Sequence, residues 1–314
     1  MTLAAVVIGR NEGARLVACL MALKGQVGQV IYVDSGSTDG SITAAEALGA
    51  TVIPLNMDKG FTAARARNAG LAGLGDGVEL VQFIDGDCVL RGGWIATATG
   101  FLNAHPDVAV VCGRRRERHP EASVYNALID REWDTAVGQT LACGGDALMR
   151  VKPVRDVGGY RDTLIAGEEP ELCLRLRQSG WEIWRLDAEM TWHDAHITRL
   201  SQWWRRSQRA GYAFAEGAFL HGAPPEYHWI AQTRRALIWG AALPLVILVL
   251  AVLTHPIALL LFAIYALQIA RLALRTDLTW ASFAVLGKFP EAIGALQFHW
   301  QRIRGAKTQI IEYK

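Results

Sequence analysis

The sequence predicts an α/β protein with a doubly wound, mostly parallel sheet, followed by a helical hairpin and an amphipathic tail. Three observations lead to this prediction. Apolar runs of strand length alternate with helical segments through the first third of the chain, which is typical of parallel sheets joined by right-handed crossovers. Residues 236–270 contain no Asp, Glu, Lys or Arg. The segment from Lys288 onward mixes basic and apolar side chains, as an amphipathic surface helix does.

The expected strands are short runs of apolar and β-branched residues that end at turn-forming residues. Their ranges are 3–8, 30–33, 50–55 and 78–84, with a later strand at 182–186. The helices expected between the first four strands cover 13–24, 41–48 and 62–74. Because Pro224 and Pro225 mark the exit from the globular part, we expect a globular domain over 1–225, a hairpin over 226–280 and a tail over 281–314.

The composition limits the function classes. The 314 residues carry a net charge of only +2, so nothing global favours nucleic acid as a partner. The five cysteines are scattered, without the paired spacing of a zinc site or a disulfide framework. Reduced thiols in a cytosolic domain are expected, with Cys88 as a small buried filler. The N-terminal residues do not resemble a secretory signal.

The uncharged stretch favours a membrane hairpin. Thr254, His255 and Pro256 divide it into halves, each about long enough to cross a hydrocarbon core of roughly 30 Å. Arg234 and Arg235 precede it, and basic residues also follow it, which places both ends on the cytoplasmic side. A pair of buried core helices or a re-entrant hairpin is the alternative. We expect a protein of the cytoplasmic membrane whose catalytic domain faces the cytosol.

The most informative motif is Asp85-Gly86-Asp87, which directly follows the strand at 78–84. A strand of a parallel sheet delivers the residues at its end to the carboxyl edge, where open α/β folds bind ligands. Two carboxylates so close together repel each other unless a cation lies between them. Mg²⁺ and Mn²⁺ prefer such oxygen ligands and usually bring phosphate oxygens with them. A solvated turn is the alternative for this sequence.

Further motifs occur in a recognisable order. Asn11 and Glu12 follow the first strand, Asp34 ends the second, and Arg67 lies at the third helix. Together with the Asp pair, this order resembles the inverting nucleotide-sugar glycosyltransferases of family 2, which have the GT-A fold. The resemblance implies that Asp34 binds the nucleobase, that Arg67 is a cation near the nucleotide, and that Asn11 and Glu12 line the same edge. Turn formation is the alternative role of Asp34.

The second half of the domain continues the resemblance. Gly144 and Gly145 match the glycine loop on the acceptor side, and an ordinary turn is the alternative. Glu168 and Glu169 match the family's Glu-Asp motif, in which the second acid is the general base; Glu169 therefore stands where Asp is usual, and Glu168 is the second candidate. These acids could instead stabilise a helix N-terminus.

Two later positions complete the predicted site. His193 lies where the family places a histidine near the metal or the diphosphate, and the expected metal ligands are Asp85, Asp87 and His193. Arg206 belongs to a basic and aromatic stretch that either covers the diphosphate or faces anionic lipid. The Gln-x-x-Arg-Trp motif of processive members is not matched by this sequence.

The resemblance implies a metal-dependent enzyme that uses Mn²⁺ or Mg²⁺. It would transfer a sugar from a nucleotide-diphosphate donor, with a UDP-sugar as the first expectation, to a lipid-linked or saccharide hydroxyl in envelope or exopolysaccharide synthesis. Ser35, where the family has a second acid, leaves the base selectivity open. A sugar nucleotidylyltransferase and an inactive membrane scaffold of the same fold are the alternatives. The sequence does not indicate an oligomeric state.

Overall fold

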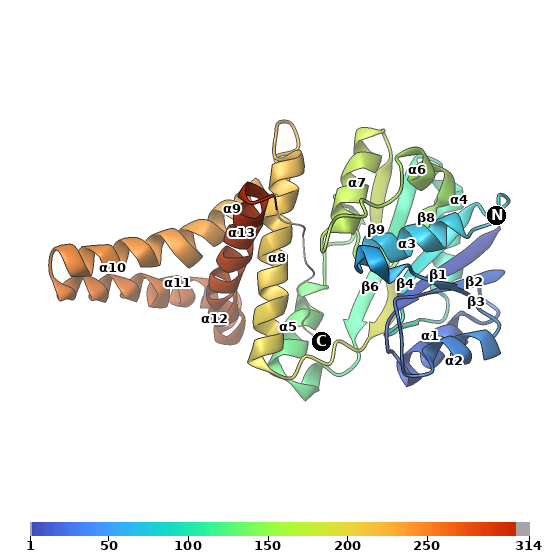
Figure 1. Cartoon of the computed structure of the whole chain (residues 1–314), viewed down its shortest axis with the longest axis horizontal. Coiled ribbons are helices and arrows are strands. Elements are labelled where there is room, and N and C mark those ends of the chain that lie inside the picture. Colours follow the sequence, from blue (N-terminus) through green and yellow to red (C-terminus); the bar gives the residue numbers. More distant parts are fainter. Residues whose placement is uncertain (1, 306–314) are drawn as a thin grey trace. The chain divides into compact units, whose positions relative to one another are not determined.

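The structure is a computed structural model that describes residues 2–305 (Figure 1). The chain divides into two compact units. The first comprises Met1–Leu164 and Glu168–Thr198, and the second comprises Ile165–Gly167 and Arg199–Lys314. The sequence-based boundary at residue 225 falls beyond this division, because α8 (Leu200–His221) packs with the helices that follow it.

The first unit is built on one mixed sheet. Within the described residues the sheet has nine strands in the order β3-β2-β1-β4-β8-β6-β9-β5, and β7 also pairs with β9. Strands β1 to β4 are parallel to one another, whereas β8, β5 and β7 run antiparallel to their neighbours. The strands are β1 (Leu3–Gly9), β2 (Gln29–Asp34), β3 (Thr51–Pro54), β4 (Leu80–Asp85), β5 (Cys88–Leu90), β6 (Val108–Glu117), β7 (Gly138–Gln139), β8 (Ala147–Arg150) and β9 (Glu182–His193).

Helices pack on the sheet through apolar faces. In α1 the buried residues Leu16, Cys19, Leu20 and Leu23 recur at helical spacing. In α3 a Cβ on Gly70 would collide with Val6, so glycine allows this helix to lie close to β1. The helices are α1 (Ala14–Leu23), α2 (Ser41–Ala47), η1 (Met57–Lys59), α3 (Ala63–Ala72), α4 (Trp94–Ala104), η2 (Pro120–Ala122), α5 (Val124–Glu132), α6 (Val151–Asp156) and α7 (Glu168–Gln178).

The strand and helix alternation expected for the first third of the chain is confirmed, with bounds that differ by a few residues. The later strand is longer than the predicted 182–186, because β9 continues as far as His193. Its continuation pairs with β6 on one side and with β5 on the other. The added length matters for function, since it brings His193 to the edge at which Asp87 lies.

The second unit contains α8, α13 (Lys288–Ile303) and the apolar helices between them in the chain. Close packing of α8 with α13 depends on two glycines. A Cβ on Gly211 would collide with the backbone of Glu291, and a Cβ on Gly294 would collide with the backbone of Gln208. The basic residues predicted for the tail beyond residue 305 lie outside the described part of the chain.

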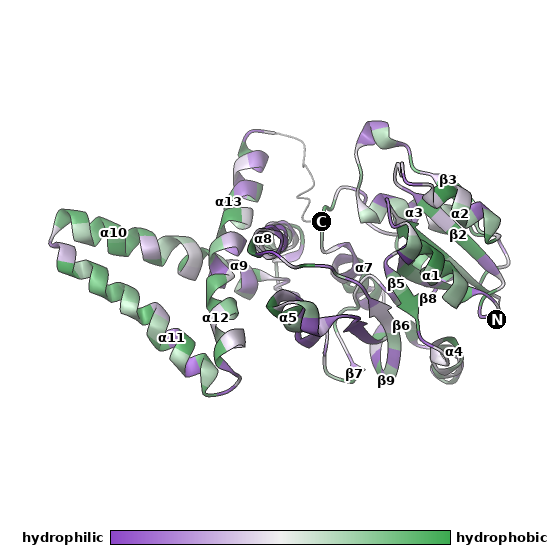
Figure 2. Cartoon of the chain, turned by 90° about the horizontal axis from the view of Figure 1, so that it is seen from below, coloured by the Kyte–Doolittle hydropathy of each residue, from purple (hydrophilic) through white to green (hydrophobic). Residues whose placement is uncertain are grey.

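The predicted hairpin consists of two apolar helical arms (Figures 1 and 2). The first arm, Ile230–Leu253, and the second, Pro256–Ala273, are long and apolar enough to cross a membrane. Their side chains face outward: Val252 is 83% exposed and Leu260 is 71% exposed. The elements are α9 (Ile230–Leu237), the π-helical turn η3 (Ile238–Ala242), α10 (Leu243–Leu253), η4 (Pro256–Phe262), α11 (Ala263–Ala273) and α12 (Leu278–Leu286).

Candidate active site

Strand register brings the predicted acids to one edge of the sheet. Strand β1 lies between β2 and β4, with Gly9 opposite Asp34 and Ile8 opposite Asp85. Because these strands are parallel, their carboxyl ends coincide, and both aspartates lie at the edge where such sheets bind ligands. Cys88 then pairs with His193 of β9, which adds the histidine to the same edge.

Arg67 lies at the centre of the site. Its guanidinium is 2% exposed and contacts three carboxylates. Nη2 lies 2.9 Å from Asp85 Oδ1, while Nη1 lies 2.8 Å from Glu168 Oε1 and 2.8 Å from Glu169 Oε1. One cation on α3 therefore joins the Asp pair at the end of β4 to the two acids at the start of α7. The predicted contact of Arg67 with the nucleotide stays a prediction.

Glu169 is suited to accept a proton near neutral pH. Burial and the neighbouring Glu168 carboxylate raise its pKa to about 7, although Arg67 opposes this change. An ordinary glutamate is fully ionised at that pH and a weak base, whereas a general base works best when its pKa lies near the operating pH. Helix α7 begins at these residues, and Pro170 is tolerated there because the first helical turn needs no backbone donor.

Asp85 is held by two arginines. Besides Arg67, Arg115 of β6 reaches it, with Nη2 3.2 Å from Asp85 Oδ2. Burial would raise the pKa of Asp85, but these two guanidinium groups hold it below its ordinary value. A Cβ on Gly145 would lie 2.7 Å from Arg67 Nη2 and 2.9 Å from Asp85 Oδ2. Gly145 is therefore required by the arginine and aspartate pair beneath it.

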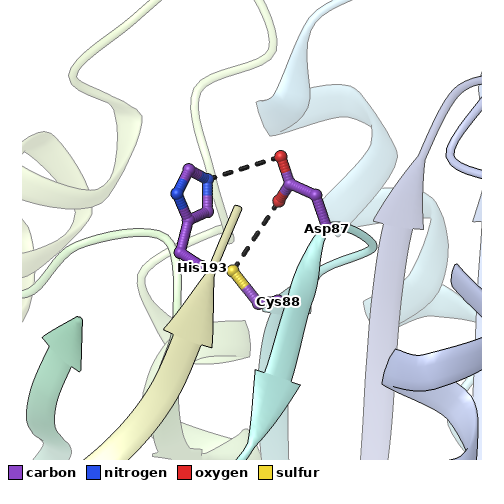
Figure 3. Close-up of side chains that lie close together, drawn as sticks. All are labelled: Asp87, Cys88 and His193. Atoms are coloured by element: carbon purple, nitrogen blue, oxygen red, sulfur yellow. Dashed lines mark hydrogen bonds and ion pairs between the residues drawn. The ribbon is translucent and has the colours of Figure 1, made fainter. Parts of the chain in front are cut away.

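Asp87 forms a second cluster with the residues on the neighbouring strands (Figure 3). His193 Nε2 lies 3.4 Å from Asp87 Oδ2, and Cys88 Sγ lies 3.7 Å from Asp87 Oδ1. One ligand atom from each of these three residues lies within 4.8 Å of the others. A carboxylate suits Mn²⁺ or Mg²⁺, whereas the imidazole and the sulfur would be softer ligands. The donor set therefore fits a divalent cation, and the predicted ligand roles of Asp85, Asp87 and His193 stay predictions.

The other N-terminal residues of the prediction organise the loops at the same edge. Asp34 is buried; its Oδ2 accepts hydrogen bonds of 2.9 Å from the N–H groups of both Gly36 and Ser37, which is the turn role. Asn11 Oδ1 accepts the N–H of Thr38 at 2.7 Å. Glu12 pairs with Arg15 at 2.7 Å. The nucleotide contacts expected of these residues stay predictions.

Two predicted residues have fewer contacts that bear on the site. A Cβ on Gly144 would meet nothing within 4 Å, so this position, unlike Gly145, is open on the side where a side chain would stand. Arg206 lies on α8 and belongs to the second unit, so it is not among the residues that the first unit brings together. The contact of Arg206 with a diphosphate or with lipid stays a prediction.

The prediction missed three residues of the site: the partly buried Arg115 and the buried Glu117 and Asp146. Asp146 is completely buried; its Oδ1 accepts the N–H of Asp85 at 3.1 Å and its Oδ2 accepts the hydroxyl of Thr191 at 2.7 Å. Burial would raise the pKa of Glu117, but His193 and two backbone N–H groups hold it below its ordinary value. The signal available in the sequence was the charged end of β6, where residues 114–117 follow an apolar run.

Comparisons with known proteins agree with this arrangement. The model of the family "Glycosyl transferase family 2" matches residues 5–156. The chain is 30% identical over 225 residues to the pre-mycofactocin glycosyltransferase of Mycobacterium tuberculosis, an alignment that covers 68% of this chain and 46% of that protein. It is 28% identical over 194 residues to succinoglycan biosynthesis protein ExoA of Rhizobium meliloti, covering 56% and 58%. The chain thus spans about half the length of the curated relatives it matches.

Solved structures show the same fold. The mannosyltransferase PcManGT from Pyrobaculum calidifontis, in complex with GDP-Man and Mn²⁺, superposes with a TM-score of 0.66 at 21% identity, over 94% of this chain and 86% of that one. TarS 1-349 from S. aureus gives a TM-score of 0.55 at 13% identity, over 97% and 92%. The motif order, the family match and these structures lead to one assignment. The chain belongs to glycosyltransferase family 2, and its first unit has the GT-A fold.

Proposed function

We propose that this protein is a metal-dependent, inverting glycosyltransferase. It transfers a sugar from a nucleoside diphosphate to a hydroxyl group of a lipid or lipid-linked saccharide at the cytoplasmic membrane. The names of the two curated relatives, a pre-mycofactocin glycosyltransferase and a succinoglycan biosynthesis protein, support sugar transfer. A UDP-sugar is the first donor to test.

One observation carries the proposal: Arg67 joins the Asp-x-Asp motif to the two acids at the start of α7. Its guanidinium contacts Asp85 of the Asp-x-Asp motif at 2.9 Å and both candidate bases at 2.8 Å. A transferase must hold a leaving diphosphate and an attacking hydroxyl on opposite sides of one anomeric carbon. Asp85 of the motif and both candidate bases lie within reach of one buried cation, which keeps their positions fixed relative to each other.

The proposed reaction divides the work between the two clusters. Glu169, with its pKa of about 7, accepts the proton of the acceptor hydroxyl as the oxygen attacks the anomeric carbon. Attack from the face opposite the diphosphate inverts the configuration at that carbon. A divalent cation held by Asp87 and His193 would neutralise the charge that develops on the leaving diphosphate. Asp85 is positioned by Arg67 and Arg115 beside that cluster.

The apolar hairpin supports a membrane acceptor. Its two arms are almost wholly unburied, and an apolar surface of this size marks a membrane or protein contact. An enzyme anchored in a bilayer meets a lipid-borne hydroxyl at a raised local concentration. A soluble saccharide acceptor would not need this anchor, so lipid-linked saccharides are the acceptors to test first.

The purified full chain in detergent tests this proposal. It is incubated with a panel of nucleotide sugars and lipid-linked acceptors, with Mn²⁺ or with excess EDTA, and released nucleoside diphosphate and the anomeric form of the product are measured. We expect inverted product that disappears with EDTA. Release of pyrophosphate instead, or transfer that persists in excess chelator, would contradict the nucleotide-sugar or the metal part of the proposal.

A further inference from the structure

Glu117 is a buried carboxylate that the proposed reaction does not use. It ends β6 and is 1% exposed. Its Oε1 accepts the N–H of His119 at 3.0 Å and the side-chain amide of Asn126 at 3.4 Å, and its Oε2 accepts the N–H of Ala195 at 2.9 Å. Burial of a charged carboxylate is costly unless it is hydrogen-bonded and lies near a group that can carry the complementary charge.

That neighbouring group is His193. In the pairing of β6 with β9, Glu117 lies opposite His193, and in the pairing of β5 with β9, Cys88 lies opposite it on the other side. The ring therefore lies between two carboxylates: Nε2 is 3.4 Å from Asp87 Oδ2, and Nδ1 is 3.7 Å from Glu117 Oε2. Trp133 packs its ring at 89° against the imidazole, with centroids 4.8 Å apart, which restricts rotation of the ring.

The two ring nitrogens differ in their surroundings. Nδ1 is buried and has no hydrogen-bond partner among residues 2–305, and Glu117 Oε2 is the carboxylate oxygen that faces it. Nε2 faces Asp87, on the side where the cluster of Figure 3 collects its ligand atoms. A histidine that binds a metal through one nitrogen commonly donates its other N–H to a carboxylate, which fixes the tautomer and the ring orientation.

We propose that Glu117 is a positioning residue that holds the proton of His193 on Nδ1 and turns the lone pair of Nε2 toward Asp87. This inference rests on the metal role proposed above, because the lone pair of Nε2 is what a divalent cation would take. The distance of 3.7 Å between Nδ1 and Glu117 Oε2 must shorten to about 3 Å for this hydrogen bond to form, a change of less than about 1 Å.

A structural role is the competing explanation, and the chain offers a matched control for it. Glu117 and Asn126 both hold the segment after β9: Glu117 binds the N–H of Ala195, and Asn126 Oδ1 accepts the N–H of Ile197 at 3.1 Å. Asn126 also donates one long hydrogen bond of 3.4 Å to Glu117 Oε1, whereas Oε2 is the oxygen that faces His193. Without this bond, Glu117 keeps its hydrogen bonds from the N–H groups of His119 and Ala195, so Asn126→Ala loosens the segment while the carboxylate stays opposite His193.

Glu117→Gln is the test variant. An amide NH₂ in place of Oε2 would donate to Nδ1 and move the ring proton to Nε2, where it blocks the metal position. We expect the variant to bind Mn²⁺ about 10- to 100-fold more weakly than the wild type. Free Mn²⁺ is measured by electron paramagnetic resonance, and thermal unfolding is followed in parallel. Asn126→Ala should lower the unfolding temperature and leave Mn²⁺ affinity within about threefold of wild type.

A second measurement uses only the wild-type protein, so the inference stays testable if Glu117→Gln does not fold. In Mg²⁺-saturated protein labelled with ¹⁵N-histidine, nuclear magnetic resonance should show His193 protonated at Nδ1 and not at Nε2. The opposite tautomer overturns the inference, as does equal loss of Mn²⁺ affinity in both variants. Wild type and Glu117→Gln with equal Mn²⁺ affinity would overturn the role of Glu117 alone. A wild type that transfers sugar but binds no Mn²⁺ would overturn the metal role as well.

Discussion

The replacement Glu169→Gln separates a catalytic role of Glu169 from a structural one, because the two roles predict opposite changes. Gln keeps the size of the side chain and removes its ability to accept a proton. If Glu169 is the general base, the rate of transfer should fall about 10²- to 10⁴-fold while nucleotide affinity stays nearly unchanged. In the wild type, kcat/KM should fall about tenfold for each pH unit below about 7, since only the ionised Glu169 accepts the proton.

The stability change follows from the same pKa. The value rises from 4.5 to about 7 on folding, so the folded state favours the protonated form. The stability that this group contributes is fully present below pH 4.5 and is lost as the pH rises through about 7. The loss is about 3 kcal/mol at about 1.36 kcal/mol per pH unit. Because Gln resembles the protonated form, Glu169→Gln should be more stable than wild type at pH 8 by up to that amount.

Two assays measure these effects. Initial rates are recorded from pH 5.5 to 8.5 on the donor and acceptor found as above, and free energies of unfolding are recorded by denaturant at pH 8. Glu171→Gln is the matched control on the same helical turn. Glu171 is also buried, but it pairs with Arg161 and Arg175 at 3.1 Å and 2.7 Å, so its replacement should lower stability and leave the rate nearly unchanged.

A small loss of stability with a nearly unchanged rate in Glu169→Gln would refute the catalytic role of Glu169. If Glu169 only stabilises the start of α7, its replacement should cost a few tenths to about 1 kcal/mol and change the rate little. A transfer rate that is nearly unchanged in both Glu169→Gln and Glu171→Gln would therefore exclude a catalytic role for Glu169. A large rate loss in Glu168→Gln alone would keep the mechanism and move the base by one residue.

Three further predictions concern the metal, the glycine loop and the hairpin. Asp87→Ala should abolish transfer and Mn²⁺ binding, as measured by rate and metal titration. The protein should remain folded by circular dichroism, because Asp87 follows the end of a strand; retained Mn²⁺ binding would exclude Asp87 as a ligand. Gly145→Ala should cost about 1–3 kcal/mol of stability and disturb Arg67 and Asp85, as measured by denaturant unfolding and by the rate of transfer. Gly144→Ala should be as stable as the wild type, and equal losses of stability in the two variants would contradict the steric argument. The full chain should resist carbonate extraction, and a variant lacking residues 243–273 should become extractable; unchanged extraction would exclude the hairpin as the anchor.

Several elements of this protein could be predicted from local pattern. The strands that carry Asp34 and Asp85 are continuous apolar runs, and parallel strands share one carboxyl edge, so both aspartates were expected at the same edge before any contact was known. The hairpin could also be predicted from the sequence, because a membrane-length segment without charge is rare in a soluble domain. Local sequence was sufficient to predict these features, because each depends on residues that are close neighbours in the chain.

Tertiary structure decided the partners of the charged residues. Arg67 lies 18 residues from Asp85 and 101 from Glu168, and nothing local indicates that one guanidinium joins them. The role of Glu117 depends on the pairing of β6 with β9, whose register shifts at Cys112/Arg114 and Arg114/Arg115, so counting alternate residues could not place it beside His193. The sequence by itself determined the fold, the edge and the acids delivered to it. Only folding decided which charges meet, because long-range register and burial, and not local pattern, set those distances and raise the pKa of Glu169 to about 7.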